Sequence, residues 1–367
     1  MSNITDYIHE KGNRTFNEAP FTDVDNLVFC YLVYYDFTGI VPGFRKDSLK
    51  SISLKEAMKL YFSIHGMSQG NVVPHLLHAA GKSRRFGAAR LSAFLSPVIE
   101  KRHTQFAAVH FEFGEHLHYI AYRGIDSSLY GWREAFQMSY KLTRAQRQAA
   151  VYLRSVMYTV LKKDPEAKFI IGGHSKGGSL ALFASSMCGS FRREHILRIY
   201  SNDGPGISAF KKLKENYQKI SERVRKIVPE YSVIGMIFEK DFPSLIVKST
   251  AKGLQQHEPM SWIVDGDHFR AAKRIAAQSR RINRALEKWI SRIDMRDREV
   301  FVSELFDAIE NTGRKIKEAA EEVPEKVKKR NKKKKQPGKI KRLRMILADT
   351  SPETRRTIRK LLWAFIK

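Results

Sequence analysis

The stretch from Lys168 to Met187 constrains the fold of this chain more than any other feature. Its sequence, KFIIGGHSKGGSLALFASSM, opens with an apolar run long enough for a buried strand and closes with an apolar segment typical of a buried helix. Between them, Gly173, Ser175 and Gly177 form a G-x-S-x-G pattern, which is meaningful when it lies between a strand and a helix. Glycine at both flanking positions lets the strand and the helix approach closely. We therefore predict a sharp turn that presents the Ser175 hydroxyl as a nucleophile, in preference to a glycine-rich turn with an ordinary serine.

Acyl transfer to a serine needs two backbone N–H donors for the oxyanion that forms. The amide of Lys176 is the first candidate, because it lies at the start of the predicted helix, where N–H groups point toward an anion. The second donor must come from an earlier junction between a strand and a loop. Arg123–Asp126 lies at such a junction, so we predict the amide of Ile125 as the second donor.

A serine nucleophile also needs a base that takes its proton and an acid that orients the base. In α/β-hydrolases these residues follow the serine in the order acid, then histidine. Asp203 follows the next predicted strand, and His257 follows the last strand region, so both fit that order. His268 is the competing base, and Glu230 and Glu239 are the competing acids.

The chain alternates strand-like and helix-like segments, which predicts an α/β fold with a mostly parallel central sheet. The N-terminal part reads as a helical cover for that sheet. Helices are predicted within residues 1–42, at 54–66, 83–100, 143–163, 209–224 and 267–291, and strands at 105–112, 117–123, 197–202, 225–228, 231–238 and 245–248.

The composition gives information about the partners and the cellular location of the protein, and little about its reaction. The net charge of +28 favours contact with anionic membrane, nucleic acid or acidic ligands, and it carries no information about the fold. Two cysteines, Cys30 and Cys188, form no disulfide framework and no metal-binding signature, which is typical of a reducing cytoplasm. The first residues lack the apolar core of a signal peptide, and no run approaches the ~20 apolar residues of a spanning helix. We expect a soluble cytoplasmic protein that needs no metal or cofactor.

Beyond about residue 290 the sequence changes character. Residues 325–344 are strongly basic and of low complexity, which is typical of a flexible linker. A final amphipathic helix follows, with arginines and lysines opposite an apolar face that includes Trp363 and Phe365. One hypothesis is that residues 326–367 bind an anionic membrane surface, which such a helix suits. Nucleic-acid binding needs the same charge, and a helix packed on the main domain beside a solvated linker is the simplest alternative.

Several short motifs carry a resemblance to known families. Tyr122–Gly124 with Trp132, and Gly173–Gly178, resemble the F-R-G-T…W and G-H-S-L-G-G motifs of class 3 lipases. The chain is similar over about residues 1–290 to a family of bacterial lipase-like α/β-hydrolases, the Mbeg-like family. The shared segments are Phe21–Asp25, Phe37–Pro42, the G-H-S-K-G-G turn, Asp203–Gly206 and Gln256–Pro259.

The chain departs from the lipase pattern at two places. Lys176 stands where a leucine usually follows the lipase serine, which puts a cation beside the turn. The segment Lys226–Pro229 lacks the aspartate of the lipase D-x-V-P motif, and for this reason we assign the acid to Asp203.

The resemblance implies an α/β-hydrolase fold and a serine hydrolase, with no particular substrate, cofactor or stable partner protein. We predict that residues 1–290 form the hydrolase domain and that residues 291–367 form a basic helical extension. The expected activity is hydrolysis of a carboxylic ester, including lipid esters, by Ser175, His257 and Asp203. The alternative is a catalytically silent fold that binds membrane or nucleic acid through its basic tail.

Overall fold

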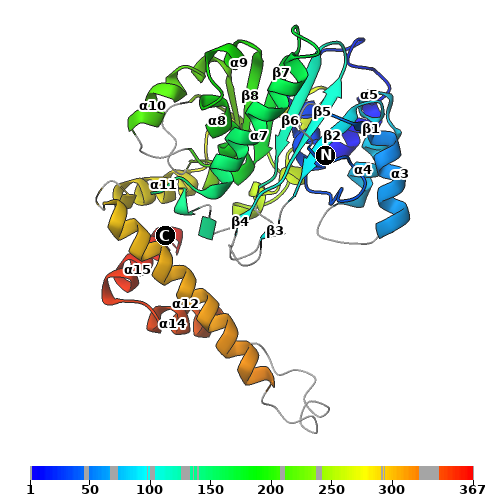
Figure 1. Cartoon of the computed structure of the whole chain (residues 1–367). Coiled ribbons are helices and arrows are strands. Elements are labelled where there is room, and N and C mark those ends of the chain that lie inside the picture. The colour runs from blue at the N-terminus through cyan, green and yellow to red at the C-terminus, as the bar shows by residue number, and fades with distance from the viewer. Residues whose placement is uncertain are drawn as a thin grey trace, which may run out of the picture.

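The computed structural model describes most of the 367-residue chain (Figure 1). The described residues are 2–44, 49–66, 73–96, 98–99, 104–124, 133–134, 136–138, 140–206, 211–236, 242–290, 292, 294–321 and 339–366.

A mixed sheet of eight strands forms the centre of the described structure. Its spatial order is β1-β2-β5-β6-β7-β8-β9-β10. The first four strands pair antiparallel, and the strands from β6 to β10 pair parallel, so the C-terminal ends of β7, β8, β9 and β10 meet at one edge. Their bounds are β1 (Ser51–Ser53), β2 (Arg90–Leu95), β5 (Ala108–Phe113), β6 (Leu117–Tyr122), β7 (Lys168–His174), β8 (Ile196–Asn202), β9 (Val224–Pro229) and β10 (Ser244–Val247).

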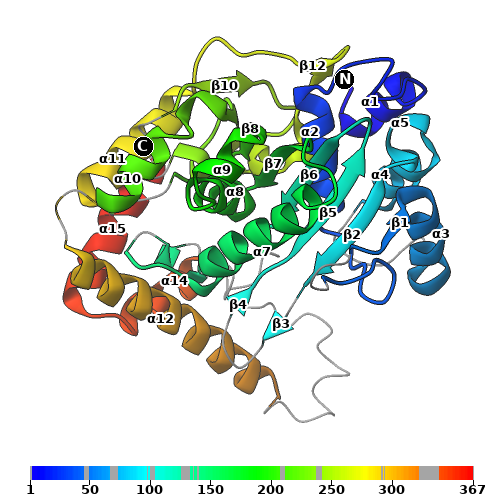
Figure 2. The same cartoon turned by 45° about the horizontal axis from the view of Figure 1, so that its top comes forward.

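Helices cover both faces of this sheet, as Figures 1 and 2 show. Successive β6 residues alternate between the two cores, with Tyr119 facing one and Ile120 facing the other, as expected of a strand buried on both faces. The N-terminal helices α1 (Ile4–Lys11), α2 (Asp23–Leu32), α3 (Leu54–His65), α4 (Pro74–Lys82) and α5 (Arg84–Gly87) contribute to the first core. The helices α7 (Arg144–Leu161) and α8 (Lys176–Ser186) contribute to the second, and α9 (Ser190–Glu194) and α10 (Lys211–Gln218) follow α8. This is the α/β-hydrolase-like arrangement that the sequence predicted.

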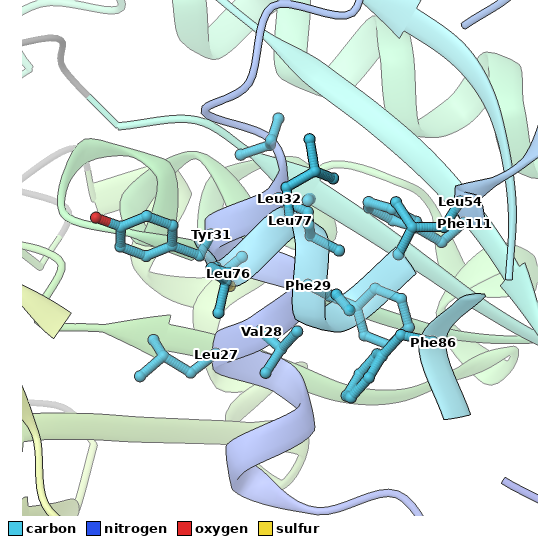
Figure 3. Packing of buried hydrophobic residues seen from close by; sticks show 14 of the residues in the cluster. Leu27, Val28, Phe29, Tyr31, Leu32, Leu54, Leu76, Leu77, Phe86 and Phe111 are labelled. Atoms are coloured by element: carbon cyan, nitrogen blue, oxygen red, sulfur yellow. The ribbon is translucent and has the colours of Figure 1, made fainter. Parts of the chain in front are cut away.

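Helix α2 is the element that joins the N-terminal segment to the sheet. Thr22 and Asp25 form a reciprocal cap at its start, and Leu27, Val28 and Phe29 are buried (Figure 3). The aromatic ring of Phe29 packs against Phe86 and Phe111 from other elements.

A buried ion pair fixes the same region. The Arg85 guanidinium donates to both carboxylate oxygens of Asp25, at 2.7 and 2.6 Å. It also donates to the backbone carbonyls of Arg14, Thr15, Ala19 and Pro20. The loop before α2 therefore folds around one guanidinium whose donors all have acceptors.

The prediction of a helix over residues 83–100 is wrong. Among the described residues of this range only α5 is helical, and β2 pairs with β1 on one side and β5 on the other. The N-terminal part thus adds two strands to the sheet in addition to covering it. The physical reason is that two ladder partners satisfy the β2 backbone, which outweighs local helix preference.

Two predicted elements nearer the C-terminus, a strand and a helix, also differ from the structure. The predicted strand at 231–238 is absent among the described residues 231–236, where η3 (Ile234–Met236) is a single 3-10 turn. The predicted helix at 267–291 begins later, as α11 (Ala277–Ile290), after the hairpin of β11 (Val264–Asp265) and β12 (His268–Phe269). A second small hairpin is formed by β3 (Val98–Ile99) and β4 (Thr104–Gln105).

The C-terminal part is helical, as predicted, and it packs on itself and on the main body. It comprises α12 (Met295–Glu321), α14 (Lys339–Ala348) and α15 (Pro352–Ile366). Both views show α14 and α15 beside α12, and a small core joins Phe306 and Ile358 to Tyr140 of the main body (Figures 1 and 2). The predicted lysine-rich linker lies mostly outside the described residues. No described helix is both long and apolar enough to cross a membrane.

The buried Asp25–Arg85 pair predicts the stability of two neighbouring variants. Arg85→Met leaves the Asp25 carboxylate buried without its cation, so we expect a loss of about 3–5 kcal/mol in the free energy of unfolding. Arg84→Met is the matched control, because solvent screens the exposed Arg84–Glu18 pair and its loss should change the stability little. Urea denaturation measures both, and equal losses for the two variants would contradict the buried pair.

Candidate active site

The turn between β7 and α8 has the geometry that the G-x-S-x-G pattern predicted. Ser175 has φ 56° and ψ −128°, a left-handed backbone conformation that is uncommon outside glycine. A side chain at Gly173 would overlap the Gly177 backbone, and one at Gly177 would overlap the Tyr122 backbone. Glycine is therefore required at both positions, because the strand and the helix approach too closely for a Cβ atom.

Asp203 follows β8 at the same edge of the sheet, also with positive φ, at 45°. Its carboxylate has two partners. Oδ2 lies 2.6 Å from His257 Nδ1, and Oδ1 accepts a hydrogen bond of 2.5 Å from the Ser232 hydroxyl. The carboxylate is fully buried, while 23% of the His257 side chain is exposed. A carboxylate at Nδ1 favours the tautomer with its proton on that nitrogen, which leaves the lone pair on Nε2.

His257 lies in a 3-10 turn, η4 (Gly253–His257), that several groups hold in place. The Gln256 side chain accepts from the Tyr231 amide at 2.8 Å, and its backbone carbonyl accepts from the indole of Trp262 at 2.8 Å. The Tyr31 hydroxyl donates to Glu258 at 3.0 Å. In the sequence, Gln256 and Glu258 were recognisable only as part of a motif, whereas the structure shows that they fix the loop that carries His257.

His174, the residue that precedes Ser175, contacts His257 in two ways. The rings of His174 and His257 are 4.6 Å apart, and His174 Nε2 donates to the His257 carbonyl at 2.8 Å. Among the described residues, no hydrogen bond joins the Ser175 hydroxyl to His257 itself. Such contacts are often long in the absence of substrate and tighten when it binds.

The competing residues of the sequence analysis lie elsewhere or outside the described structure. His268 is in β12 with 70% of its side chain exposed, and its ring contacts the adjacent Asp267. The backbone of Glu230 bridges β10 and the residue before α11. Glu239 and Ile125, the predicted second oxyanion donor, lie outside the described residues.

The structure explains why Lys176 can replace the leucine that usually follows the serine in the lipase motif. Its side chain is buried, and its ammonium lies 2.9 Å from the buried Glu134 carboxylate. The predicted cation beside the turn is therefore directed into the protein and neutralised. Glu134 was missed as a functional candidate, although a lysine within an apolar segment is a signal that an acidic partner must exist.

A buried polar network lies under the turn and connects it to α2. The Tyr119 hydroxyl donates to Asn26 Oδ1 at 2.7 Å, and Asn26 Nδ2 donates to Asn202 Oδ1 at 3.0 Å. Asn202 Nδ2 then donates to the Gly173 carbonyl at 3.3 Å. The Cys30 thiol completes the network 2.9 Å from the Tyr119 hydroxyl, and burial raises the pKa of that thiol to about 12, so it stays protonated. The network thus supports Gly173, two residues before Ser175, and Asn202, directly before Asp203.

The described residues include no cluster of three or more His, Cys, Asp or Glu side chains placed to hold a metal ion.

Comparison with known proteins identifies the family. Residues 80–307, more than half of the chain, match the family model described as Mbeg1-like. The chain belongs to the Mbeg1-like family. This confirms the resemblance inferred from the motifs, and no curated protein matches the chain.

Several solved structures resemble this Mbeg1-like chain in fold. One is the lipase of Rhizopus microsporus var. chinensis, with 15% identity, a TM-score of 0.35, and coverage of 52% of this chain and 69% of that one. Another is the Rhizomucor miehei lipase in its propeptide complex, with 14% identity, a TM-score of 0.35, and coverage of 56% and 73%. A third is a mutant form of MDLA from Penicillium cyclopium, with 12% identity, a TM-score of 0.40, and coverage of 68% and 84%.

The buried Lys176–Glu134 pair gives a prediction for stability. Lys176→Met leaves the Glu134 carboxylate buried without this cation, and we expect a loss of about 3–5 kcal/mol in the free energy of unfolding. The double variant Lys176→Met, Glu134→Leu should recover most of that loss, because it removes both charges of the pair. Chemical denaturation measures both. If the double variant lost the sum of the two single losses, the pair would not be the source of the effect.

Proposed function

We propose that this protein hydrolyses carboxylic esters with Ser175 as nucleophile, His257 as general base and Asp203 as the acid that orients His257. The observation that carries the proposal is the 2.6 Å contact of His257 Nδ1 with Asp203, at the sheet edge where Ser175 has its strained backbone. Nucleophile, base and acid follow in the chain order typical of α/β-hydrolases.

In the proposed reaction, Ser175 Oγ attacks the carbonyl carbon of the ester while its proton passes to His257 Nε2. The imidazolium that forms is stabilised by Asp203, which accepts a hydrogen bond from Nδ1–H and stays ionised. The ester bond breaks as His257 returns the proton to the departing alcohol, which leaves an acyl group on Ser175. A water molecule, deprotonated by His257, then releases the acid and restores the serine.

The negative oxygen of each tetrahedral intermediate needs donors that are already in place. The backbone amide of Lys176 lies at the N-terminal end of α8, where the helix dipole also favours negative charge. Ile125 remains the proposed source of the second amide. Burial of the Lys176 side chain does not remove this backbone role.

Ser175→Ala gives the most direct test of the proposed reaction. We expect the variant to fold, because alanine keeps the Cβ atom, and to lose at least about 10³-fold in kcat on p-nitrophenyl esters of several acyl lengths, since the members of a triad act as a unit. Hydrolysis by the variant at the parent rate would exclude Ser175 as the nucleophile. A parent protein that hydrolyses none of the esters would favour the alternative of a catalytically silent binding module.

Variants of His257 and Asp203 test the other two members of the triad, and His268→Ala is the matched control. His257→Ala should be about as severe as Ser175→Ala, and Asp203→Asn should lose about 10³–10⁴-fold in kcat because the imidazole loses its orientation. His268→Ala should keep the parent rate, because the exposed His268 is in a separate hairpin. The reverse order of the two histidines would show that the base is assigned wrongly.

We further propose that the C-terminal extension brings the enzyme to an anionic membrane surface, which for a cytoplasmic protein is the inner face of the membrane. Although α14 and α15 pack on other helices, basic side chains on both remain exposed, among them Lys341, Arg344, Arg356 and Arg359. The lysine run at 332–335 precedes them in the sequence. Lipid esters at such a surface would then be the substrates.

Co-sedimentation with vesicles that contain anionic lipid tests this partner. Each lysine near such a surface contributes about 1 kcal/mol, so changing Lys332–Lys335 to glutamine should lower vesicle binding by at least about 10²-fold at moderate salt. The matched control changes four exposed lysines of the N-terminal part, Lys50, Lys55, Lys59 and Lys82, and should bind as the parent does. Equal losses for the two variants would contradict the proposal, as would a parent protein that ignores anionic vesicles and binds DNA.

A further inference from the structure

Three hydrogen bonds form a continuous chain across the candidate active site. The Gly124 amide donates to the Tyr34 hydroxyl at 3.2 Å, and the Tyr34 hydroxyl lies 3.2 Å from His174 Nδ1. His174 Nε2 in turn lies 2.8 Å from the His257 carbonyl. This hydrogen-bond chain therefore starts at Gly124 after β6, passes through His174 beside Ser175, and ends at the backbone of His257, the proposed base.

The direction of every bond in this chain is fixed by chemistry. A carbonyl can only accept, so His174 Nε2 must carry a proton. Burial lowers the pKa of His174 well below its usual value, so the ring is neutral and Nδ1 can only accept. Tyr34 must then donate to Nδ1, which leaves its oxygen to accept from the Gly124 amide. Burial also raises the pKa of Tyr34, which keeps its hydroxyl proton in place.

The two ends of the chain are the two loops that the reaction depends on. Gly124 directly precedes Ile125, the predicted oxyanion donor, and its own amide is directed to Tyr34. A Cβ atom at Gly124 would lie 2.7 Å from the His174 carbonyl oxygen and 3.3 Å from Ser175 Cβ, so Gly124 packs directly on the turn. His257 is held at the other end through its backbone, while Asp203 holds its ring.

We propose that Tyr34 and His174 are positioning residues, which hold the His257 loop and the Gly124 loop in one fixed arrangement around Ser175. This inference rests on the proposed function, and it gives Tyr34, from the segment after α2, a role in turnover. A displacement of about 1 Å at a reacting group can cost about 10²-fold in rate, so a chain that fixes two loops at once affects kcat more than substrate binding.

Two adjacent tyrosines allow a matched test. Tyr34→Phe removes one donated and one accepted hydrogen bond and keeps the ring. Tyr35→Phe removes the same number, since Tyr35 donates to the Val73 carbonyl at 2.6 Å and accepts from the Leu77 amide at 3.1 Å. We expect kcat for ester hydrolysis to fall about tenfold in Tyr34→Phe with KM within about threefold, and to stay at the parent value in Tyr35→Phe. Equal kcat in the two variants would overturn the inference.

A double-mutant cycle tests whether Tyr34 acts through His174. His174→Ala breaks the hydrogen-bond chain at its centre, so adding Tyr34→Phe to it should lower kcat much less than Tyr34→Phe does in the parent. Two falls that multiply in the double variant would mean that Tyr34 does not act through His174, and would overturn the inference.

A spectroscopic readout separates this inference from the proposed function. Nitrogen-15 NMR of the histidine rings should show His174 with its proton on Nε2 in the parent, and a shift of its Nδ1 signal in Tyr34→Phe but not in Tyr35→Phe. A proton on Nδ1 of His174 in the parent would overturn the chain. If the rings behave as expected and the parent hydrolyses no ester, the proposed function fails. If the parent is active and Tyr34→Phe keeps its kcat, only the positioning role fails.

Discussion

The rest of the site depends on the left-handed backbone at Ser175. A non-glycine residue in such a conformation costs about 1–3 kcal/mol, and it persists only when its surroundings determine it. Here the surroundings are the backbone contacts that exclude a side chain at Gly173 and Gly177, and the bond of the Ser175 amide to the Asn202 carbonyl. The strain is thus held by β6, β7 and β8 together, which are central strands of the sheet.

Asp203, which follows the neighbouring strand β8, also has a strained backbone held by an adjacent strand. It too has positive φ, and its amide is bonded to the Ile227 carbonyl on β9, so its backbone is held from the next strand. Below both residues, Asn26 and Tyr119 connect β8 and β6 to α2. Helix α2 therefore supplies hydrogen bonds to the site and also covers the sheet with apolar side chains. This explains why a fully buried asparagine, Asn26, lies next to the apolar residues of α2.

The features that were predictable from sequence are those with a local signature. The strand, the glycines and the helix around Ser175 are contiguous, and the chain order of Asp203 and His257 follows from the position of the strands. The contacts of Lys176 with Glu134 and of Tyr34 with His174 join residues far apart in the chain, so no local pattern contains them. The short apolar run of β2 fits a helix as well as a strand, so the sequence alone predicts the wrong structure there. Pairing with β1 and β5 in the sheet makes this segment a strand.

Ser175 is the proposed nucleophile, activated by His257 and Asp203. Its role can be tested by reaction of the 367-residue protein with a fluorophosphonate, followed by mass spectrometry of the peptides. We expect one covalent adduct, on Ser175, which forms much more slowly when Asp203 is changed to asparagine. A folded protein that forms no adduct, or forms it on another residue, would show that Ser175 is not an activated nucleophile.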